Sequence, residues 1–215
     1  MILLQEKSTI VLAGAFNPAI LTPNWVAKNA LGYEKDRAFQ VQVLAPVGGA
    51  IGVAHRFSFD GISYSPTLQN VMFYLDGKNI DECDRAAKVA ARILDELPHT
   101  PILGVGFNFG FVVKDPSPAL LDLLQGSAEL AGAFPGGAQV VSRGWSNALT
   151  WLDSLVTIQC HFDGSIVNID ANFHHGVIAA TDASLVLKKA DSYKAHLNAA
   201  LAAASALSQQ DLEEA

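Results

Sequence analysis

Short sequence patterns recur in the same order in the two halves of this chain. Residues 12–17 and 103–108 share the pattern Leu, small, any, small, Phe, Asn. A hydroxyl residue and a proline follow each copy, as Thr22 with Pro23 and as Ser117 with Pro118. Such a pair predicts a helix start, because the hydroxyl can cap the helix and proline lacks only an N–H that would have no partner. Matches in the same order predict an internal duplication.

Each half continues with a hairpin signal and ends with a helix signal. The pairs Asp60-Gly61 and Asp163-Gly164 lie between alternating apolar residues, a pattern typical of hairpin turns. An apolar period of 3.6 residues predicts one closing helix from Asn79 or Asp81 to Pro98 and another from about Asp191. We therefore predict an α+β fold of two β-α-β(3-4)-α units, residues 1–100 and 101–208. They would form one curved antiparallel sheet with helices on one face, followed by a flexible acidic tail over 209–215.

Strand alternation predicts the chemistry of the two sheet faces. A two-residue turn at Asp163-Gly164 would place Phe162 opposite Ser165 and put the apolar residues of this hairpin on one face. The other face would carry uncharged polar residues and remain without covering helices. In the strand 103–113 this second face begins with glycines, which are typical of a close approach by another element or of a local bend. The sequence leaves both of these alternatives open.

The low content of charged residues and the net negative charge argue against some classes of partner. Only 16% of the residues are charged, against about 25% in a typical domain. Acidic residues outnumber basic ones by 21 to 14, for a net charge of −7, which disfavours nucleic acid as a partner. No apolar run reaches the roughly 20 residues that span a membrane, and the first residues lack signal-peptide features. We therefore expect no membrane association and a cytoplasmic location, bacterial or in a phage-infected cell, with Cys83 and Cys160 as reduced thiols.

The candidate catalytic groups favour structural roles. His161 and His174 would lie roughly 27 Å apart along the predicted hairpin, too far to share a metal ion. Asp60 and Asp163 are explained by their turns. The chain has no nucleophile motif, and the glycines 104–110 lack the Lys-Ser/Thr of a phosphate loop. We predict no catalytic residue, no metal and no cofactor.

Some motifs resemble known proteins. They are Phe-Asn-Pro-Ala-Ile at 16–20, Pro-Asn-Trp at 23–25, His-Thr-Pro at 99–101 and Gly-Phe-Asn-Phe at 106–109. This set resembles a group of uncharacterised bacterial and phage-associated proteins, and the resemblance implies no activity and no site residue. The predicted element order is similar to the duplicated, saddle-shaped fold of the TATA-box-binding protein family. The polar sheet face predicted here lacks the basic residues that DNA binding would require.

These observations favour a non-enzymatic protein-binding or assembly protein, such as an assembly or accessory component of a phage or a bacterium. It would use the polar sheet face or a sheet edge against a protein partner or a second copy of itself, as a homo-oligomer. The alternative is a small-molecule-binding protein or an enzyme with a pocket on the same face. In that case Arg56 would hold an anionic group and His161 would transfer a proton. The candidate binding residues are Gln40, Arg56, Gln159, His161, Asn168 and Asp170.

Overall fold

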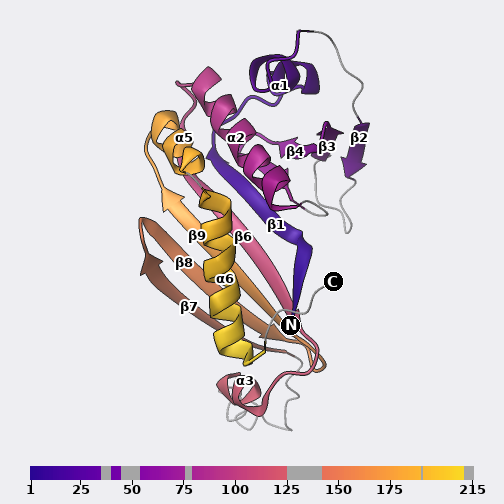
Figure 1. Cartoon of the computed structure of the whole chain (residues 1–215), viewed down its shortest axis with the longest axis vertical. Helices are drawn as coiled ribbons and strands as arrows, with labels where there is room; N and C mark the ends of the chain where they lie inside the picture. Colours follow the sequence, from indigo (N-terminus) through magenta and orange to yellow (C-terminus); the bar gives the residue numbers. More distant parts are fainter. Residues whose placement is uncertain (35–39, 45–53, 76–78, 125–141, 190, 211–215) are drawn as a thin grey trace, which may run out of the picture.

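The computed structural model describes residues 1–34, 40–44, 54–75, 79–124, 142–189 and 191–210, with only the backbone of 40–44 and 54. Within these residues nine strands form one antiparallel sheet in the order β2-β3-β4-β5-β1-β6-β9-β8-β7 (Figure 1). The strands are β1 (Ile2–Gly14), β2 (Gln40–Leu44), β3 (Ala54–Phe59), β4 (Ile62–Pro66), β5 (Asn70–Tyr74), β6 (Ile102–Val113), β7 (Arg143–Trp151), β8 (Ser154–Phe162) and β9 (Val167–Gly176). The helices are α1 (Pro23–Asn29), α2 (Ile80–Glu96), α3 (Pro118–Leu123), α5 (Ala180–Lys188) and α6 (Ser192–Ser208). None of these helices is long and apolar enough to cross a membrane.

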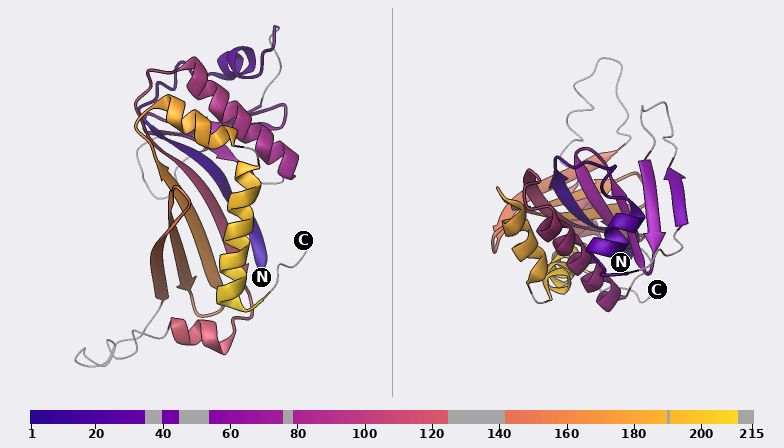
Figure 2. Two further views of the ribbon diagram at one scale, coloured as in Figure 1. Left: turned by 60° about the vertical axis from the view of Figure 1, so that its left-hand side comes forward. Right: turned by 90° about the horizontal axis from the view of Figure 1, so that it is seen from above.

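Helices α2, α5 and α6 lie on one face of the sheet (Figure 1, Figure 2). Helix α2 packs against α5 and α6, and α6 packs on β6 and β9. The core lies between these layers. Its central side chains come from alternate positions of β1 and β6 and are Ile10, Leu12, Val105, Phe107, Phe109 and Phe111. The predicted α+β class, the curved antiparallel sheet and the placement of helices on one face are confirmed.

Local signals set most of the helix starts. Thr22 and Ser117 each accept a hydrogen bond from the backbone three residues later, with proline in the first turn, as expected. Asn79 caps α2 through a capping box in which its side chain accepts from the Glu82 N–H and Glu82 accepts from the Asn79 N–H. The second half differs from the prediction, because α5 precedes the expected closing helix α6.

The first Asp-Gly turn has the predicted form. Phe59 pairs with Ile62, and both Asp60 (φ 48°) and Gly61 (φ 74°) have positive φ angles. This is the backbone of a type I′ hairpin, which Asp-Gly favours. Arg85 of α2 donates to the Asp60 carbonyl at 2.9 Å and forms an ion pair with its carboxylate, so the turn is tied to the helix layer.

The second Asp-Gly turn is longer than predicted. Phe162 pairs with Val167, not with Ser165, which leaves four residues in the loop. The Asp163 carboxylate accepts from the backbone N–H groups of Ser165 at 3.1 Å and Ile166 at 3.2 Å. These bonds stabilise a wider turn and lower the pKa of Asp163. Because the register moves by two residues, every side chain remains on its predicted face.

The internal duplication is not confirmed. The strand order does run similarly outward from the central pair, as β1-β5-β4-β3-β2 on one side and β6-β9-β8-β7 on the other. However, Phe16 and Asn17 follow the end of β1, whereas Phe107 and Asn108 lie inside β6. The two Asp-Gly turns also join non-equivalent strands, β3 with β4 and β8 with β9. The division at residues 100 and 101 therefore stays a prediction.

The first and last residues that the structure describes, Met1 and Gln210, meet beside β1. Gln210 accepts a hydrogen bond from the N-terminal amino group at 3.1 Å and donates to the Asp115 carbonyl at 2.6 Å. The predicted tail 209–215 thus begins with a residue pair that the structure describes, while residues 211–215 lie outside the described part of the chain.

Candidate functional site

Four of the six predicted binding residues form one patch on the sheet face opposite the helices. Gln159 pairs with Asp170 and His161 pairs with Asn168 across β8 and β9. Alternation along both strands is strict, since the intervening residues are buried beneath the helices. With their neighbours these residues make up the polar patch, which consists of Lys7, Thr157, Gln159, His161, Asn168, Asp170 and Asn172.

The other two predicted residues lie elsewhere. Arg56 is on β3 and Gln40 is paired with Ser58 at the β2 edge. Six strand steps separate β3 from β8, roughly 29 Å along the sheet. The Arg56 guanidinium lies 4.0 Å from the centre of the Tyr74 ring, a cation–π contact. Arg56 and His161 therefore do not line one common pocket.

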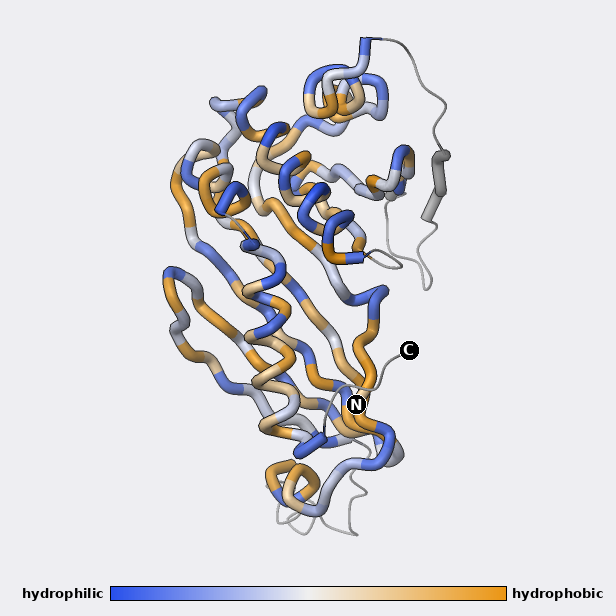
Figure 3. The backbone as a smooth tube through the Cα atoms, in the orientation of Figure 1, coloured by the Kyte–Doolittle hydropathy of each residue, from blue (hydrophilic) through white to orange (hydrophobic). Residues whose placement is uncertain are grey.

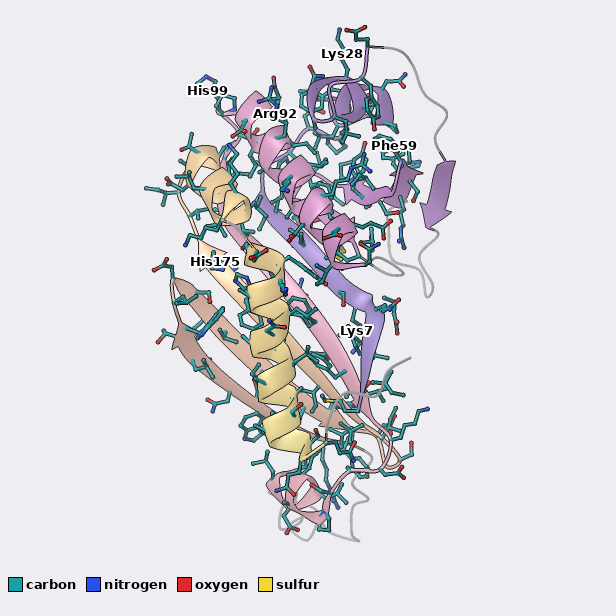
Figure 4. The ribbon with its side chains drawn as sticks, in the orientation of Figure 1. Lys7, Lys28, Phe59, Arg92, His99 and His175 are labelled. Carbon is teal, nitrogen blue, oxygen red and sulfur yellow. The ribbon has the colours of Figure 1, made fainter. Side chains whose placement is uncertain are left out.

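The charges of the polar patch pair with each other. Lys7 Nζ donates to Asp170 Oδ1 at 2.8 Å, and both side chains are about two-fifths exposed (41% and 44%). Lys7 reaches this position because the register between β1 and β6 shifts between Leu4 and Thr9. The ribbon of β1 bends in this stretch, beside the labelled Lys7 (Figure 4). Because the charges of Lys7 and Asp170 compensate each other, this pair adds no net charge to the patch.

A chain of amide and hydroxyl groups links the patch to the centre of the sheet. Asn108 Nδ2 donates to Thr9 Oγ1 at 2.9 Å, and Asn172 Nδ2 donates to Asn108 Oδ1. Thr9 is buried, whereas Asn172 is exposed. The three side chains occupy directly paired positions on β1, β6 and β9. These hydrogen bonds fix the orientation of the Asn172 amide at the surface.

The glycines of β6 make room for side chains of the neighbouring strands. A Cβ atom at Gly104 would lie 2.4 Å from His174 Cε1, and one at Gly110 would lie 2.4 Å from Lys7 Cδ. Of the two alternatives left open by the sequence, close approach therefore applies at these two positions. The approaching groups are side chains from β9 and β1.

A second cluster lies beneath the helices, where two histidines meet. His175 of β9 and His196 of α6 are 4% and 5% exposed, and their Nε2 atoms are 2.8 Å apart. The His196 ring stacks on Phe107 with a centroid distance of 4.1 Å, and the edges of Phe173 and Trp151 also meet it. Figure 4 labels His175 beside the first turns of α6.

The hydrogen bond between the two histidines runs from His175 as donor to His196 as acceptor. His196 Nδ1 lies 2.6 Å from the Ser192 carbonyl oxygen, which can only accept, so His196 carries its proton on Nδ1. His196 Nε2 is then an acceptor, and His175 donates to it from Nε2. His175 Nδ1 remains as a buried acceptor without a partner among the described residues.

Burial keeps both rings neutral. It lowers the pKa of His175 to about 4, with smaller contributions from His196 and Lys189. Burial also lowers the pKa of His196, although the Ser192 carbonyl opposes this change. A neutral pair can move a proton in principle, but it contacts aromatic rings and lies under the helix layer. We assign it a structural role in the core.

The sequence did not predict that His175 and His196 pair. Two features of the sequence indicate that both histidines are buried. His175 has the same strand parity as the buried Phe173, and His196 follows Tyr193 by three residues on the apolar face of α6. Each histidine therefore occupies a core position in its own element.

The histidines of the sheet surface do not form a metal site. His161 pairs with Asn168, which is six residues from His174, or roughly 20 Å along β9. Within the described part of the chain no group of three His, Cys, Asp or Glu side chains could hold a metal ion. Cys83 and Cys160 are buried free thiols, and burial raises the pKa of Cys160 to about 11.

An apolar hollow lies between β7 and α6. Its volume is about 260 Å³. The residues that line it are Leu149, Trp151, Val156, Ile158, Phe173, Ala199, Ala202 and Ala203. It opens on the helix side of the sheet, on the face opposite the polar patch.

Comparison with known proteins adds no assignment. Neither models of protein families nor curated proteins give a match to this chain.

Proposed function

We propose that the protein is a non-enzymatic binding protein that acts in an assembly, bacterial or phage-borne, by presenting the polar patch to a protein partner. The observation that carries this proposal is the composition of an exposed sheet surface. Amide, hydroxyl and imidazole groups from two neighbouring strands cover it, and its one lysine and one aspartate neutralise each other.

Such a surface suits contact with another protein. Gln159, Asn168 and Asn172 each offer donors and acceptors, so they can bond to either polar group of a partner's backbone. Specific interfaces carry about one hydrogen bond per 100–200 Å² and are depleted in unpaired charge at their centre. The sheet supports the patch from below, because the alternate residues Ile158, Cys160 and Ile169 are buried in the core. Little ordering of the patch is then required on binding.

The experiment is site-specific photo-crosslinking in the source cell, with a benzophenone amino acid at His161. We expect one partner to be recovered from this position. In the same chain, Gln159→Lys places an unpaired charge in the contact and should reduce the cross-linked yield at least tenfold, since a desolvated charge is costly. The matched control is Gln69→Lys, an exposed glutamine in the loop between β4 and β5.

A partner whose yield falls equally with both lysine variants, or with neither, would contradict the proposal. The alternative of a small ligand on this face has its own readout. A compound that raises the melting temperature of the wild type and not of His161→Ala would favour a small-molecule site over a protein partner.

A further inference from the structure

Strand β7 forms an edge of the sheet. Only β8 pairs with it among the strands that the structure describes. Residues 146–150 are all exposed, including Leu149 at 45%. Alternate residues of such an edge direct their N–H and C=O groups away from the sheet, where a further strand can accept and donate.

The usual devices that block an edge are lacking within β7 itself. The strand reads Arg-Gly-Trp-Ser-Asn-Ala-Leu-Thr-Trp, with one charge at its first position and no proline. Its nine residues keep an uninterrupted register with β8, so no bulge turns the edge away. The length exceeds the 5–6 residues common in globular proteins. Exposed edges with these properties are pairing sites.

We propose that a second copy of the chain docks on β7, with the two β7 strands pairing antiparallel about a twofold axis. Full overlap of the strands places Asn147 opposite Asn147 of the second copy. Trp145 then lies opposite Leu149 on the helix side, and Ser146 lies opposite Ala148 on the other side. The strand is thus complementary to itself, because the large apolar side chains of Trp145 and Leu149 meet each other and the small side chains of Ser146 and Ala148 meet each other.

The ends of the paired strands also match. Arg143 falls opposite Trp151 of the second copy, and a guanidinium beside an indole ring gives a cation–π contact. No carboxylate lies between Arg143 and Trp151. A chain with a net charge of −7 repels its own copy over most of its surface, whereas this strand brings no acidic groups together.

The hollow between β7 and α6 fits the same arrangement. Trp145 of the second copy would lie beside Leu149 at the rim of this hollow. Its volume of about 260 Å³ is ample for an aromatic ring, since cavities of about 150 Å³ bind benzene. Charge is also sparse on the neighbouring helix. Lys194 is the one charged residue of α6. Figure 3 shows hydrophilic stretches in blue along α2, whereas the later turns of α6 are pale to orange.

This inference is independent of the polar patch, which lies on the opposite sheet face over β8 and β9. Self-pairing is measured on the purified chain, and binding at the patch is measured through another protein. The failure of either leaves the other standing.

The first test is the mass of the full chain in solution, by light scattering and sedimentation up to about 1 mM. We expect the wild type to dimerise and Leu149→Lys to weaken the dimer at least tenfold, because two lysines would approach within one interface. The matched control is Leu185→Lys, an exposed leucine (63%) on α5, which should dimerise as the wild type does.

The second test is the register. Residues directly opposite in an antiparallel pair have Cα atoms about 4.5–5.5 Å apart, within the range of a disulfide. Asn147→Cys should therefore form a symmetric disulfide dimer under mild oxidation. The matched control Asn198→Cys lies on α6, which packs on β6 and β9. The two α6 helices would be roughly 24 Å apart, so this control should not cross-link. Cys83 and Cys160 are buried and do not interfere.

A monomeric wild type would overturn the proposal, and so would a dimer that Leu149→Lys and Leu185→Lys leave equally intact. Failure of Asn147→Cys to cross-link, with Asn198→Cys cross-linking instead, would overturn it as well. If Leu149→Lys does not fold by circular dichroism, the cysteine pair decides the question alone.

Discussion

The buried pair of His175 and His196 predicts how stability depends on pH. Burial holds the pKa of His175 at about 4 in the folded chain, against about 6.5 in an unfolded one. Between these values the unfolded chain binds the proton and the folded chain does not. The free energy of unfolding therefore falls as the pH falls through this window. The contribution of neutral His175 is fully present above about pH 6.5 and is lost toward about pH 4.

The magnitude follows from the difference between the two pKa values. The whole window corresponds to about 3 kcal/mol, and the part between about pH 7 and pH 5 to about 2 kcal/mol. The upper part of the window is preferable for measurement, because most carboxylates titrate near pH 4 and would mask the effect below about pH 5.

The assay is urea unfolding of the wild type and of His175→Gln at these two pH values. Glutamine can still donate to His196 but does not titrate. We expect the wild type to lose about 2 kcal/mol more than the variant on acidification. The control is His174→Gln, the adjacent histidine, which is exposed on the opposite face. Equal losses in the wild type and in His175→Gln would refute the reasoning. An NMR titration of the wild type checks it independently, since the His175 ring should stay neutral down to about pH 5.

Two further predictions concern backbone packing and helix capping. Gly14→Ala should lower the free energy of unfolding by about 1–3 kcal/mol, because its Cβ would lie 2.4 Å from the Pro101 carbonyl oxygen. Gly144→Ala, with its nearest contact at 3.6 Å, should change the urea midpoint little, and an equal loss in both would contradict this account. Asn79→Ala removes the cap that accepts from the Glu82 N–H and should cost about 1 kcal/mol. An unchanged melting temperature would show that the capping box is unimportant.

The sequence predicted features that depend on a few adjacent residues. The caps at Thr22, Ser117 and Asn79 and the turn at Asp60 follow from hydrogen bonds and φ angles within four residues. The two faces of β8 and β9 could also be predicted, because alternation with a period of two decides them. Four candidate site residues were therefore placed together, even though the loop at Asp163 was longer than expected.

The tertiary structure decided what depends on neighbours distant in the chain. Arg56 and His161 have the right parity for one face, but strand order places them six strands apart. Lys7 reaches Asp170 only because β1 shifts its register against β6.

The local periodicity of the sequence determined which side chains are buried, since it depends only on the geometry of a strand or helix. Packing decided which buried groups meet. His175 and His196 are 21 residues apart, and their hydrogen bond exists because α6 crosses the sheet at β9. The position of β7 at the edge is likewise a property of strand order. For this reason the surface proposed for a second copy could be located only in the folded chain.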